Sequence, residues 1–339
     1  MITQKNKKHI LFSCLMVLVL VIAVACSATG TSAFPENMYI LNQQIDFLPN
    51  VIPLAEGPVV SMDAAPAVPT VLMPKASGKT TYANTSGSAV IDASNTADGY
   101  VMIKYTGTST AKLKVIITGE SKENYTYNLN NKGDFEVFPL SDGNGEYKIG
   151  VYQNVSGNKY STLFSKAIKV ELKDEFAPFL LPNQYVNYSE DSEVVKKAAE
   201  LTKDCKTDLE KIEKVYKFVV DNFTYDQEKA ATVQSGYLPE VDKVLAAKKG
   251  ICFDYAAVMA SMLRSQNVPC KLVVGYTGEA YHAWINTYLE GKGWVQGVIY
   301  FNGKEWKLMD PTFASSSKSS AKIMEYIGNG KNYEAKFLY

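Results

Sequence analysis

Histidine, cysteine and net charge are all scarce in this chain of 339 residues. It has two histidines and five cysteines, and thirty-five basic residues balance thirty-five acidic ones. A formal net charge of zero removes the basic surface that nucleic-acid-binding and polybasic membrane-surface proteins need, so no nucleic-acid partner is expected. With so few histidines, and no cysteines or aspartates at ligand spacing, we expect no zinc or calcium site and no cofactor.

The apolar run near the start of the chain is short for a membrane-spanning helix. It extends over sixteen residues from Ile10 to Ala25, whereas a spanning helix needs about 20. Lysines precede the run and small residues end it, a pattern typical of an export signal. Ala23-Val24-Ala25-Cys26 resembles the lipobox of bacterial lipoproteins, so we expect a lipid on Cys26 to anchor the chain to the outer face of the cell membrane. Cleavage after Ala25 without lipidation and an uncleaved signal anchor stay open, and all three place the rest of the chain outside the cytoplasm.

Few reactive side chains remain once residues 1–26 are assigned to the signal peptide and lipobox. Cys205, Cys252 and Cys270 are too few for a disulfide framework, although a Cys205–Cys270 bridge stays open. His282 is the one imidazole that follows the signal segment.

Proline spacing and strand patterns divide the next part of the chain. Residues 27–79 carry proline too often for a helix or a central strand, and we interpret them as a semi-extended tether. In residues 80–174, β-branched and aromatic residues alternate between turn clusters, which predicts an all-β, immunoglobulin-like sandwich with a binding or supporting role. The expected strands are Tyr100 to Tyr105, Ala111 to Thr118, Tyr125 to Asn128, Asp134 to Leu140, Glu146 to Asn154 and Ser161 to Leu172.

Residues 175–339 change to helical periodicity and form the second expected domain. A helix is predicted from Ser192 to Thr202, and Thr207-Asp208-Leu209-Glu210 is a capping box that opens a second helix. A third short helix follows Pro239 and ends at Lys248-Lys249-Gly250.

The segment Gly250-Ile251-Cys252-Phe253 begins a further helix, which has Cys252 in its first turn and runs to stop signals at Asn267 and Pro269. The unpaired N–H groups and the positive end of the helix dipole favour a thiolate in the first turn. Gly250 permits the close backbone approach that this start needs. A lone cysteine at a helix start is more often an inert buried residue, so the position alone does not establish catalysis.

His282 supplies what a cysteine nucleophile lacks. A thiolate that attacks an amide needs an acid to protonate the leaving amine, and an imidazole at the start of a strand is the one available. Asp310, at the end of a later strand before Pro311, is the carboxylate that would orient the imidazole. Cys252, His282 and Asp310 are therefore the predicted catalytic triad.

The ordered set of motifs resembles the bacterial branch of the transglutaminase-like superfamily. The resemblance covers about residues 190 to 315. The matching segments are Phe223-Thr224-Tyr225-Asp226, Tyr237-Leu238-Pro239, Lys249-Gly250-Ile251-Cys252-Phe253-Asp254-Tyr255-Ala256, Val273-Val274-Gly275-Tyr276, His282-Ala283-Trp284 and Asp310-Pro311-Thr312. It implies a papain-like α+β fold, with the cysteine on a central helix packed against an antiparallel sheet that carries His282 and Asp310. It also implies acyl chemistry on amides through a thioester.

Two features depart from a simple triad. Animal transglutaminases use a tryptophan upstream of the cysteine to stabilise the oxyanion, whereas all three tryptophans here lie downstream. The backbone N–H of Cys252 is one expected oxyanion donor, and Gln234 and Tyr225 are candidates for the other. A plain three-strand meander would place His282 and Asp310 at opposite sheet edges. We therefore expect residues 291 to 304 to form an excursion that turns at Asn302-Gly303, so that the strand ending at Asp310 pairs directly with the His282 strand.

The remaining residues near the motifs have simpler interpretations. Trp284 is expected to pack under the imidazole, and Cys270 to be a small buried side chain. Tyr276 and Tyr281 are candidates for a cleft lining, and Asp254 is an N-terminal helix charge without a chemical role.

The expected function is a cell-surface cysteine enzyme that cleaves or transfers amide bonds of a protein or peptide substrate, with hydrolysis slightly preferred. The alternatives are a catalytically silent binding module and an adhesive component of the cell envelope. The sequence does not indicate an oligomeric state.

Overall fold

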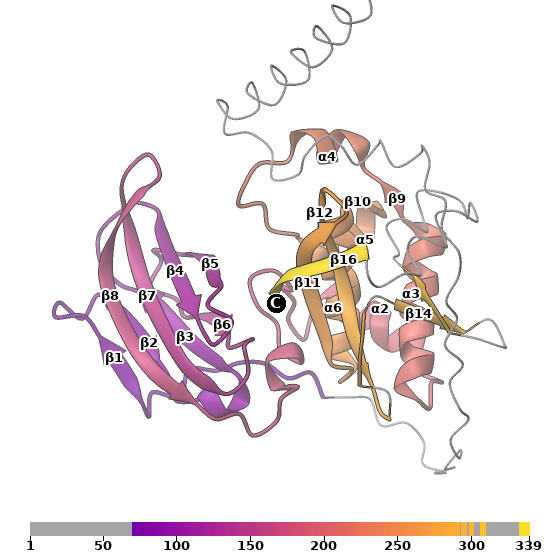
Figure 1. Cartoon of the computed structure of the whole chain (residues 1–339), viewed down its shortest axis with the longest axis horizontal. Helices are drawn as coiled ribbons and strands as arrows, with labels where there is room; N and C mark the ends of the chain where they lie inside the picture. Colours follow the sequence, from indigo (N-terminus) through magenta and orange to yellow (C-terminus); the bar gives the residue numbers. More distant parts are fainter. Residues whose placement is uncertain (1–69, 292, 297, 302–305, 310–331) are drawn as a thin grey trace, which may run out of the picture.

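The computed structural model describes residues 70–291, 293–296, 298–301, 306–309 and 332–339. Its elements lie in two groups that sit side by side, a strand-rich part and a part that combines helices with a sheet (Figure 1). Among the described residues, none of the helices combines the length and apolar character needed to cross a bilayer.

Two four-stranded antiparallel sheets make up the strand-rich part. One has the order β1-β2-β3-β6 and the other β5-β4-β7-β8. Alternate side chains of β4, Leu113, Val115 and Ile117, are buried in a cluster that residues of both sheets share, as expected for a sandwich. The strands are β1 (Thr81–Ala83), β2 (Ala89–Asp92), β3 (Tyr100–Tyr105), β4 (Leu113–Thr118), β5 (Asn124–Leu129), β6 (Glu136–Pro139), β7 (Gly145–Ser156) and β8 (Lys159–Val170).

The six strands predicted between residues 100 and 172 are confirmed, with ends that differ by a few residues. The sequence analysis missed β1 and β2, whose three and four residues are too few to show an alternating pattern. The immunoglobulin-like topology of the sandwich stays a prediction, as does the division of the chain into domains.

Helices dominate the chain between residues 193 and 265. The predicted capping box is confirmed, because Glu210 N donates to Thr207 Oγ1 and Thr207 N donates to the Glu210 carboxylate, both at 3.3 Å. The sequence Gln227–Thr232 lacks apolar periodicity, and its short helix was not predicted. The helices are α2 (Glu193–Thr202), α3 (Asp208–Asn222), α4 (Gln227–Thr232), α5 (Val241–Ala247) and α6 (Cys252–Ser265), preceded by the 3-10 turns η2 (Thr96–Asp98) and η3 (Ala177–Phe179).

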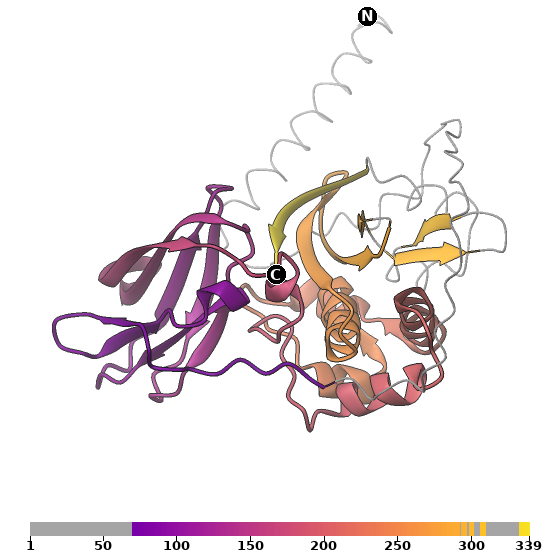
Figure 2. The ribbon, with the colours of Figure 1, turned by 90° about the horizontal axis from the view of Figure 1, so that it is seen from below.

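Helix α6 is the centre of this part of the protein. Every residue from Cys252 to Ser265 is buried. Helices α2, α3 and α5 pack against α6, and so do strands β11 (Cys270–Thr277) and β12 (Ala280–Leu289) (Figure 2). The expected central helix on an antiparallel sheet is thus confirmed for the described residues.

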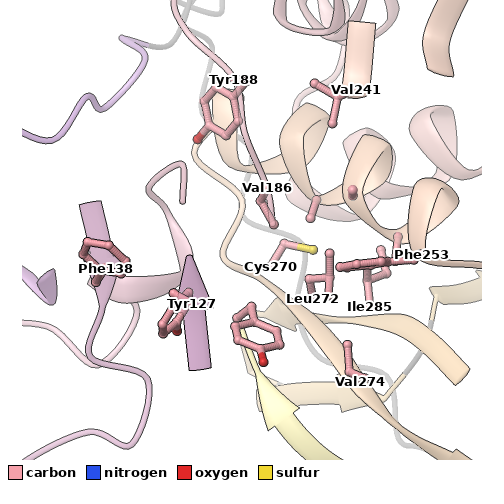
Figure 3. Close-up of a cluster of buried hydrophobic side chains, with 14 of the residues drawn as sticks. Tyr127, Phe138, Val186, Tyr188, Val241, Phe253, Cys270, Leu272, Val274 and Ile285 are labelled. Atoms are coloured by element: carbon pink, nitrogen blue, oxygen red, sulfur yellow. The ribbon is translucent and has the colours of Figure 1, made fainter. Parts of the chain in front are cut away.

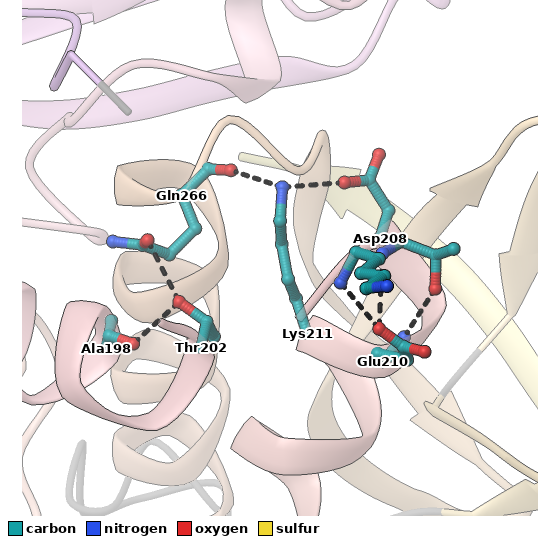
Figure 4. Close-up of polar contacts among 8 residues, drawn as sticks. Ala198, Thr202, Asp208, Glu210, Lys211 and Gln266 are labelled. Carbon is teal, nitrogen blue, oxygen red and sulfur yellow. Dashed lines mark hydrogen bonds and ion pairs between the residues drawn. The ribbon is translucent and has the colours of Figure 1, made fainter. Parts of the chain in front are cut away.

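Polar side chains fix the far end of α6. Gln266 Oε1 accepts from Thr202 Oγ1 of α2 at 3.0 Å, and Gln266 O accepts from Lys211 Nζ of α3 at 3.2 Å (Figure 4). Lys211 also pairs with Asp208 at 2.9 Å. Neighbouring helices therefore hold the end of α6 that lies opposite Cys252.

The sheet beside α6 is antiparallel, with the order β13-β12-β11-β16. Its outer strands are β13 (Gly293–Gln296) and β16 (Tyr333–Leu338). Two short parallel strands, β9 (Thr224–Tyr225) and β10 (Lys249–Gly250), pair separately. Strand β16 was not predicted, because no local pattern shows that it returns to pair with β11.

One topological prediction is wrong. Strand β15 (Trp306–Met309) pairs with β14 (Val298–Phe301), not with the His282 strand β12. The physical reason is the short connection: Phe301 pairs with Trp306, and closing a short loop costs less chain entropy than joining a distant strand. The proposed turn at Asn302-Gly303 and the residue Asp310 lie outside the described residues.

Aromatic residues fill the seam between the sandwich and the α6 part. The Tyr185 and Tyr339 rings lie 4.2 Å apart, and both contact Tyr127 of the sandwich. Tyr185 Oη donates to the backbone oxygen of Thr126 at 2.8 Å. Figure 3 shows Tyr127 on one side of this seam and Leu272 and Ile285 on the other, in one continuous cluster. The two parts therefore share a buried apolar interface.

Lys271 lies on β11 against aromatic rings. Its ammonium is 3.8 Å from the ring centroid of Trp294 and 4.7 Å from that of Phe179. Burial lowers the pKa of Lys271 from 10.5 to about 8, and the charge of Glu175 opposes part of the shift.

We expect this lysine to give the stability a measurable pH dependence. Between about pH 8 and 10.5, the unfolded chain binds a proton that the folded chain does not, so stability rises with pH across that window. The substitution Lys271→Met should remove this rise. The measurement is the free energy of unfolding of both proteins at pH 7.5 and pH 10, with exposed Lys217→Met as control. A difference between wild type and variant that is the same at both pH values would contradict the expectation.

Candidate active site

Cys252 is the first residue of α6 and is 1% exposed. The chain enters the helix through β10, whose Gly250 pairs with Tyr225 of β9. A Cβ atom on Gly250 would lie 2.6 Å from the Cβ of Asp254, which is closer than real Cβ contacts allow. The predicted need for glycine at this position is confirmed, and its cause is the close packing of the Asp254 side chain.

His282 is the third residue of β12 and is fully buried. The topology brings it to the same end of the domain as Cys252. Helix α6 runs away from Cys252, β11 returns antiparallel to it, and β12 begins where β11 ends, with Thr277 paired to Ala280. Both predicted residues are therefore placed at the end of the layer where α6 starts.

Tyr281 links the two elements at this end. Burial raises its pKa to about 12, with further contributions from the neighbouring Tyr276 and Cys252 side chains. Its ring lies 5.4 Å from that of Tyr276, which is 38% exposed. Tyr281 is therefore a neighbour of Cys252, and a cleft lined by the two tyrosines stays a prediction.

The imidazole is surrounded by aromatic rings. The His282 and Trp284 rings are stacked with centroids 6.0 Å apart, and Tyr333 of β16 lies 6.4 Å from His282 and 5.2 Å from Trp284. Side chains alternate along a strand, so Ala283 and Ile285 lie on the opposite face of β12, within the main hydrophobic core. The prediction that Trp284 packs against the imidazole is confirmed, whereas the contribution of Tyr333 was not predicted.

Two predicted site residues lie outside the described part of the chain. They are Asp310, the expected orienting carboxylate, and Cys26, the expected lipid anchor. The arrangement of Cys252, His282 and Asp310 as a catalytic triad stays a prediction, and so does the lipid anchor on Cys26.

The other cysteines are both buried and free. Cys205 and Cys270 carry no disulfide, so the bridge left open by the sequence is absent from this structure. Burial raises the pKa of both thiols, that of Cys270 to about 12. Cys270 is the small buried side chain that the sequence predicted, and neither thiol is poised for nucleophilic attack.

The two candidate oxyanion donors differ in their placement. The Gln234 amide donates to the backbone oxygen of Thr232 at 2.9 Å and is exposed. Tyr225 lies in β9 opposite Gly250, two residues before Cys252. The strand pairing therefore favours Tyr225 over Gln234 as a neighbour of the thiol.

A charged network that the sequence analysis did not assign lies at the first turn of α6. The Asp254 carboxylate is fully buried and accepts from Ile251 N at 2.9 Å, from Tyr237 Oη at 2.5 Å and from Lys229 Nζ at 2.6 Å. The sequence separations between Lys229, Tyr237 and Asp254 match no known motif. Only the fold brings the three side chains together. Residues of the loop around α4 thereby contact the first turn of the cysteine helix.

The central segment of the chain matches a known family. Residues 195–297 match the family model of the Transglutaminase-like superfamily, and this segment is a transglutaminase-like core with mixed helices and strands. The match includes Cys252 and His282 and the elements that carry them.

Curated relatives share part of this region. The chain is 24% identical over 182 residues to the uncharacterized protein YebA of Bacillus subtilis (strain 168), covering 47% of this chain and 25% of YebA. It is 27% identical over 129 residues to the kyphoscoliosis peptidase of Mus musculus, covering 34% of this chain and 17% of that protein. The matched region therefore spans a quarter or less of the length of these relatives.

Among solved structures, the red sea bream transglutaminase aligns with a TM-score of 0.25 and 12% identity. The alignment covers 64% of this chain and 48% of that structure.

Proposed function

We propose that this protein is a cell-surface transglutaminase-like enzyme that cleaves or transfers amide bonds through a thioester on Cys252. The observation that carries the proposal is the topology of the site: helix α6 and strand β12, which packs against it, begin at the same end of this part of the protein (Figure 1). A nucleophile at the helix start and an imidazole on the strand are the parts that acyl transfer from an amide requires.

In the proposed reaction, the Cys252 thiolate attacks the substrate carbonyl carbon and the carbonyl electron pair moves to oxygen. The backbone N–H of Cys252 donates to that oxyanion, and Tyr225 is the candidate second donor. Collapse of the tetrahedral species breaks the C–N bond, and the His282 imidazolium protonates the leaving amine. Water or a second amine then attacks the thioester and regenerates the thiol.

The carboxylate that orients His282 is proposed to be Asp310. The packing of Trp284 and Tyr333 against the imidazole restricts the ring in addition. We propose hydrolysis of a protein or peptide as the main outcome. The word peptidase in the name of the mouse relative agrees with this preference.

The location of the enzyme is proposed from residues 1–26. An export signal that ends in a lipidated Cys26 would anchor the protein to the outer face of the cell membrane. Residues 27–79 would act as the tether and the sandwich as a supporting or binding domain.

The test is pH-dependent alkylation of the full-length chain with iodoacetamide, read by mass spectrometry at each cysteine. We expect Cys252 to react faster than a free cysteine below neutral pH, and His282→Ala to slow it about tenfold or more, because the imidazolium stabilises the thiolate. Cys270 serves as the internal control and should react only on unfolding, since it is 0% exposed. Labelling of Cys252 that does not depend on His282 would favour a catalytically silent binding module instead.

A further inference from the structure

Asp254 is a buried charge that the proposed reaction does not use. Its side chain is 0% exposed, and burying a carboxylate is costly unless a cation and hydrogen bonds compensate for it. The compensation comes from Lys229 and Tyr237, which belong to a different segment of the chain. The free-energy cost of burying this carboxylate suggests that its charge has a role at the site.

The carboxylate belongs to the same first turn of α6 as the nucleophile. Asp254 Oδ2 is 2.9 Å from Ile251 N, the amide that immediately precedes Cys252, and it caps the first turn of α6. This hydrogen bond fixes the turn whose free N–H groups are proposed to bind the thiolate and the oxyanion. An uncompensated carboxylate there would also oppose a negative charge on the thiol.

Lys229 is placed to cancel that effect. Its ammonium contacts Asp254 Oδ2 at 2.6 Å and Tyr237 Oη at 2.5 Å, and it lies 4.3 Å from the Tyr237 ring centroid. Burial and the hydrogen bond to Asp254 raise the pKa of Tyr237, so its hydroxyl stays a neutral donor. The Lys229 side chain is 28% exposed. A substitution at this position therefore does not leave a cavity in the core.

Among the described residues, a second ion pair lies near this turn. Asp226 of the β9 segment pairs with Lys249 of β10 at 3.2 Å, and β12 contributes Tyr281 and His282. The charges of Lys229 and Asp254 can each be removed by a single substitution that leaves the Asp226–Lys249 pair intact.

We propose that Lys229 and Tyr237 are positioning residues, which hold the Asp254 carboxylate against the first turn of α6 and offset its charge beside Cys252. The proposal rests on Cys252 being the nucleophile of the proposed function. It gives Lys229 and Tyr237 a role at the active site that the sequence analysis did not assign to either side chain.

Opposite effects of the two charges distinguish this role from simple structural support. Removing the Lys229 charge leaves a net negative charge near the thiol, so the pH midpoint of Cys252 alkylation should rise by about half to one pH unit. Removing the Asp254 charge should lower the midpoint by a similar amount. Removing both should restore it, because the pair is neutral in the wild type.

The experiment measures the pH profile of iodoacetamide labelling at Cys252 in the full-length chain. The variants are Lys229→Met, Asp254→Asn, the double variant, and Lys229→Arg, which keeps the charge and should retain the wild-type midpoint. Tyr237→Phe, which removes one donor to Asp254, should raise the midpoint. Lys243→Met, on α5 with a side chain 77% exposed, is the matched control and should leave the midpoint unchanged.

Midpoints that move in the same direction for Lys229→Met and Asp254→Asn, or not at all, would overturn the proposal. If Asp254→Asn does not fold, Lys229→Met against Lys229→Arg decides the question alone. His282→Ala is measured in parallel. If Cys252 labelling depends on His282 but the midpoints do not shift in opposite directions, only this proposal is rejected. If Cys252 labelling does not depend on His282, the proposed function is rejected.

Discussion

Replacing Cys252 with alanine is expected to lower kcat/KM for amide hydrolysis by about 10⁴-fold or more. The substitution removes the sulfur that forms the thioester, and no other described cysteine lies at the start of a helix next to the His282 strand. The fold should persist, because alanine is small, favours helices and needs no hydrogen-bond partner. The measurement is turnover of an unfolded protein substrate by the full-length chain, together with the free energy of unfolding.

Cys205→Ala is the matched control, since it makes the same change at another buried cysteine that is 6% exposed. It should retain full turnover. Residual turnover of the Cys252 variant within tenfold of wild type would contradict the assignment of the nucleophile. Addition of a fluorescent primary amine to the same assay separates the two outcomes of the thioester, and we expect free acid to exceed amide product.

Local signals carried most of the sequence-based fold prediction. Strands of the sandwich and helices α2, α3, α5 and α6 were predicted because each contains several residues of one period and ends at a turn or cap. The placement of Cys252 in the first turn of α6 was predicted correctly for the same reason. Elements of two or three residues, such as β1, β9 and β10, were missed because they hold less than one readable repeat.

Long-range pairing could not be predicted in the same way. Strand β16 pairs with β11 across about sixty residues of sequence, and its Tyr333 contributes to the surroundings of His282. Pairing of β15 with β14 instead of β12 shows the reverse error, in which a functional requirement was used to choose a distant partner. Backbone hydrogen bonds are interchangeable between strands, so register depends on packing that the sequence does not display locally.

The polar parts of the site were equally hidden. Asp254 was recognised as a helix-start charge, but its partners Lys229 and Tyr237 precede it by 25 and 17 residues. No spacing rule connects them. A sign was nonetheless available in one case: Arg264 is the single arginine of a chain with thirty-five basic residues, and it lies within the apolar helix that Cys252 opens.

Substitution of Arg264 by methionine is expected to be the most destabilising single change in the α6 part of the protein, by about 3–5 kcal/mol. The side chain is 0% exposed. Its Nε donates to Cys270 O at 2.8 Å, Nη1 donates to Leu181 O at 2.7 Å, and Nη2 donates to Tyr339 O. One guanidinium thereby joins α6, β11, the segment that leads from the sandwich and the residue after β16.

Methionine fills part of the volume but removes the guanidinium donors from three buried backbone oxygens, of which Tyr339 O still accepts from Leu272 N at 2.9 Å. Each unsatisfied group costs about 1–3 kcal/mol. Arg264→Lys should also destabilise, by about 2 kcal/mol or more, because a single ammonium cannot reach three carbonyls that a planar fork reaches together. The measurement is the urea midpoint and slope of the full-length chain, with Lys217→Met, whose side chain is 76% exposed, as a control within about 0.5 kcal/mol of wild type.

The Arg264→Met substitution should also change the slope of the urea transition. Because Arg264 holds the seam between the sandwich and the α6 part, its loss should weaken the coupling between them, and a single transition should broaden or separate into two. His282 should be affected through β16, so the Arg264→Met variant should lose the His282-dependent labelling of Cys252 at urea concentrations below those that melt the sandwich. A variant that unfolds in one transition at the wild-type midpoint would show that the three carbonyls find other donors and that the guanidinium does not hold the seam.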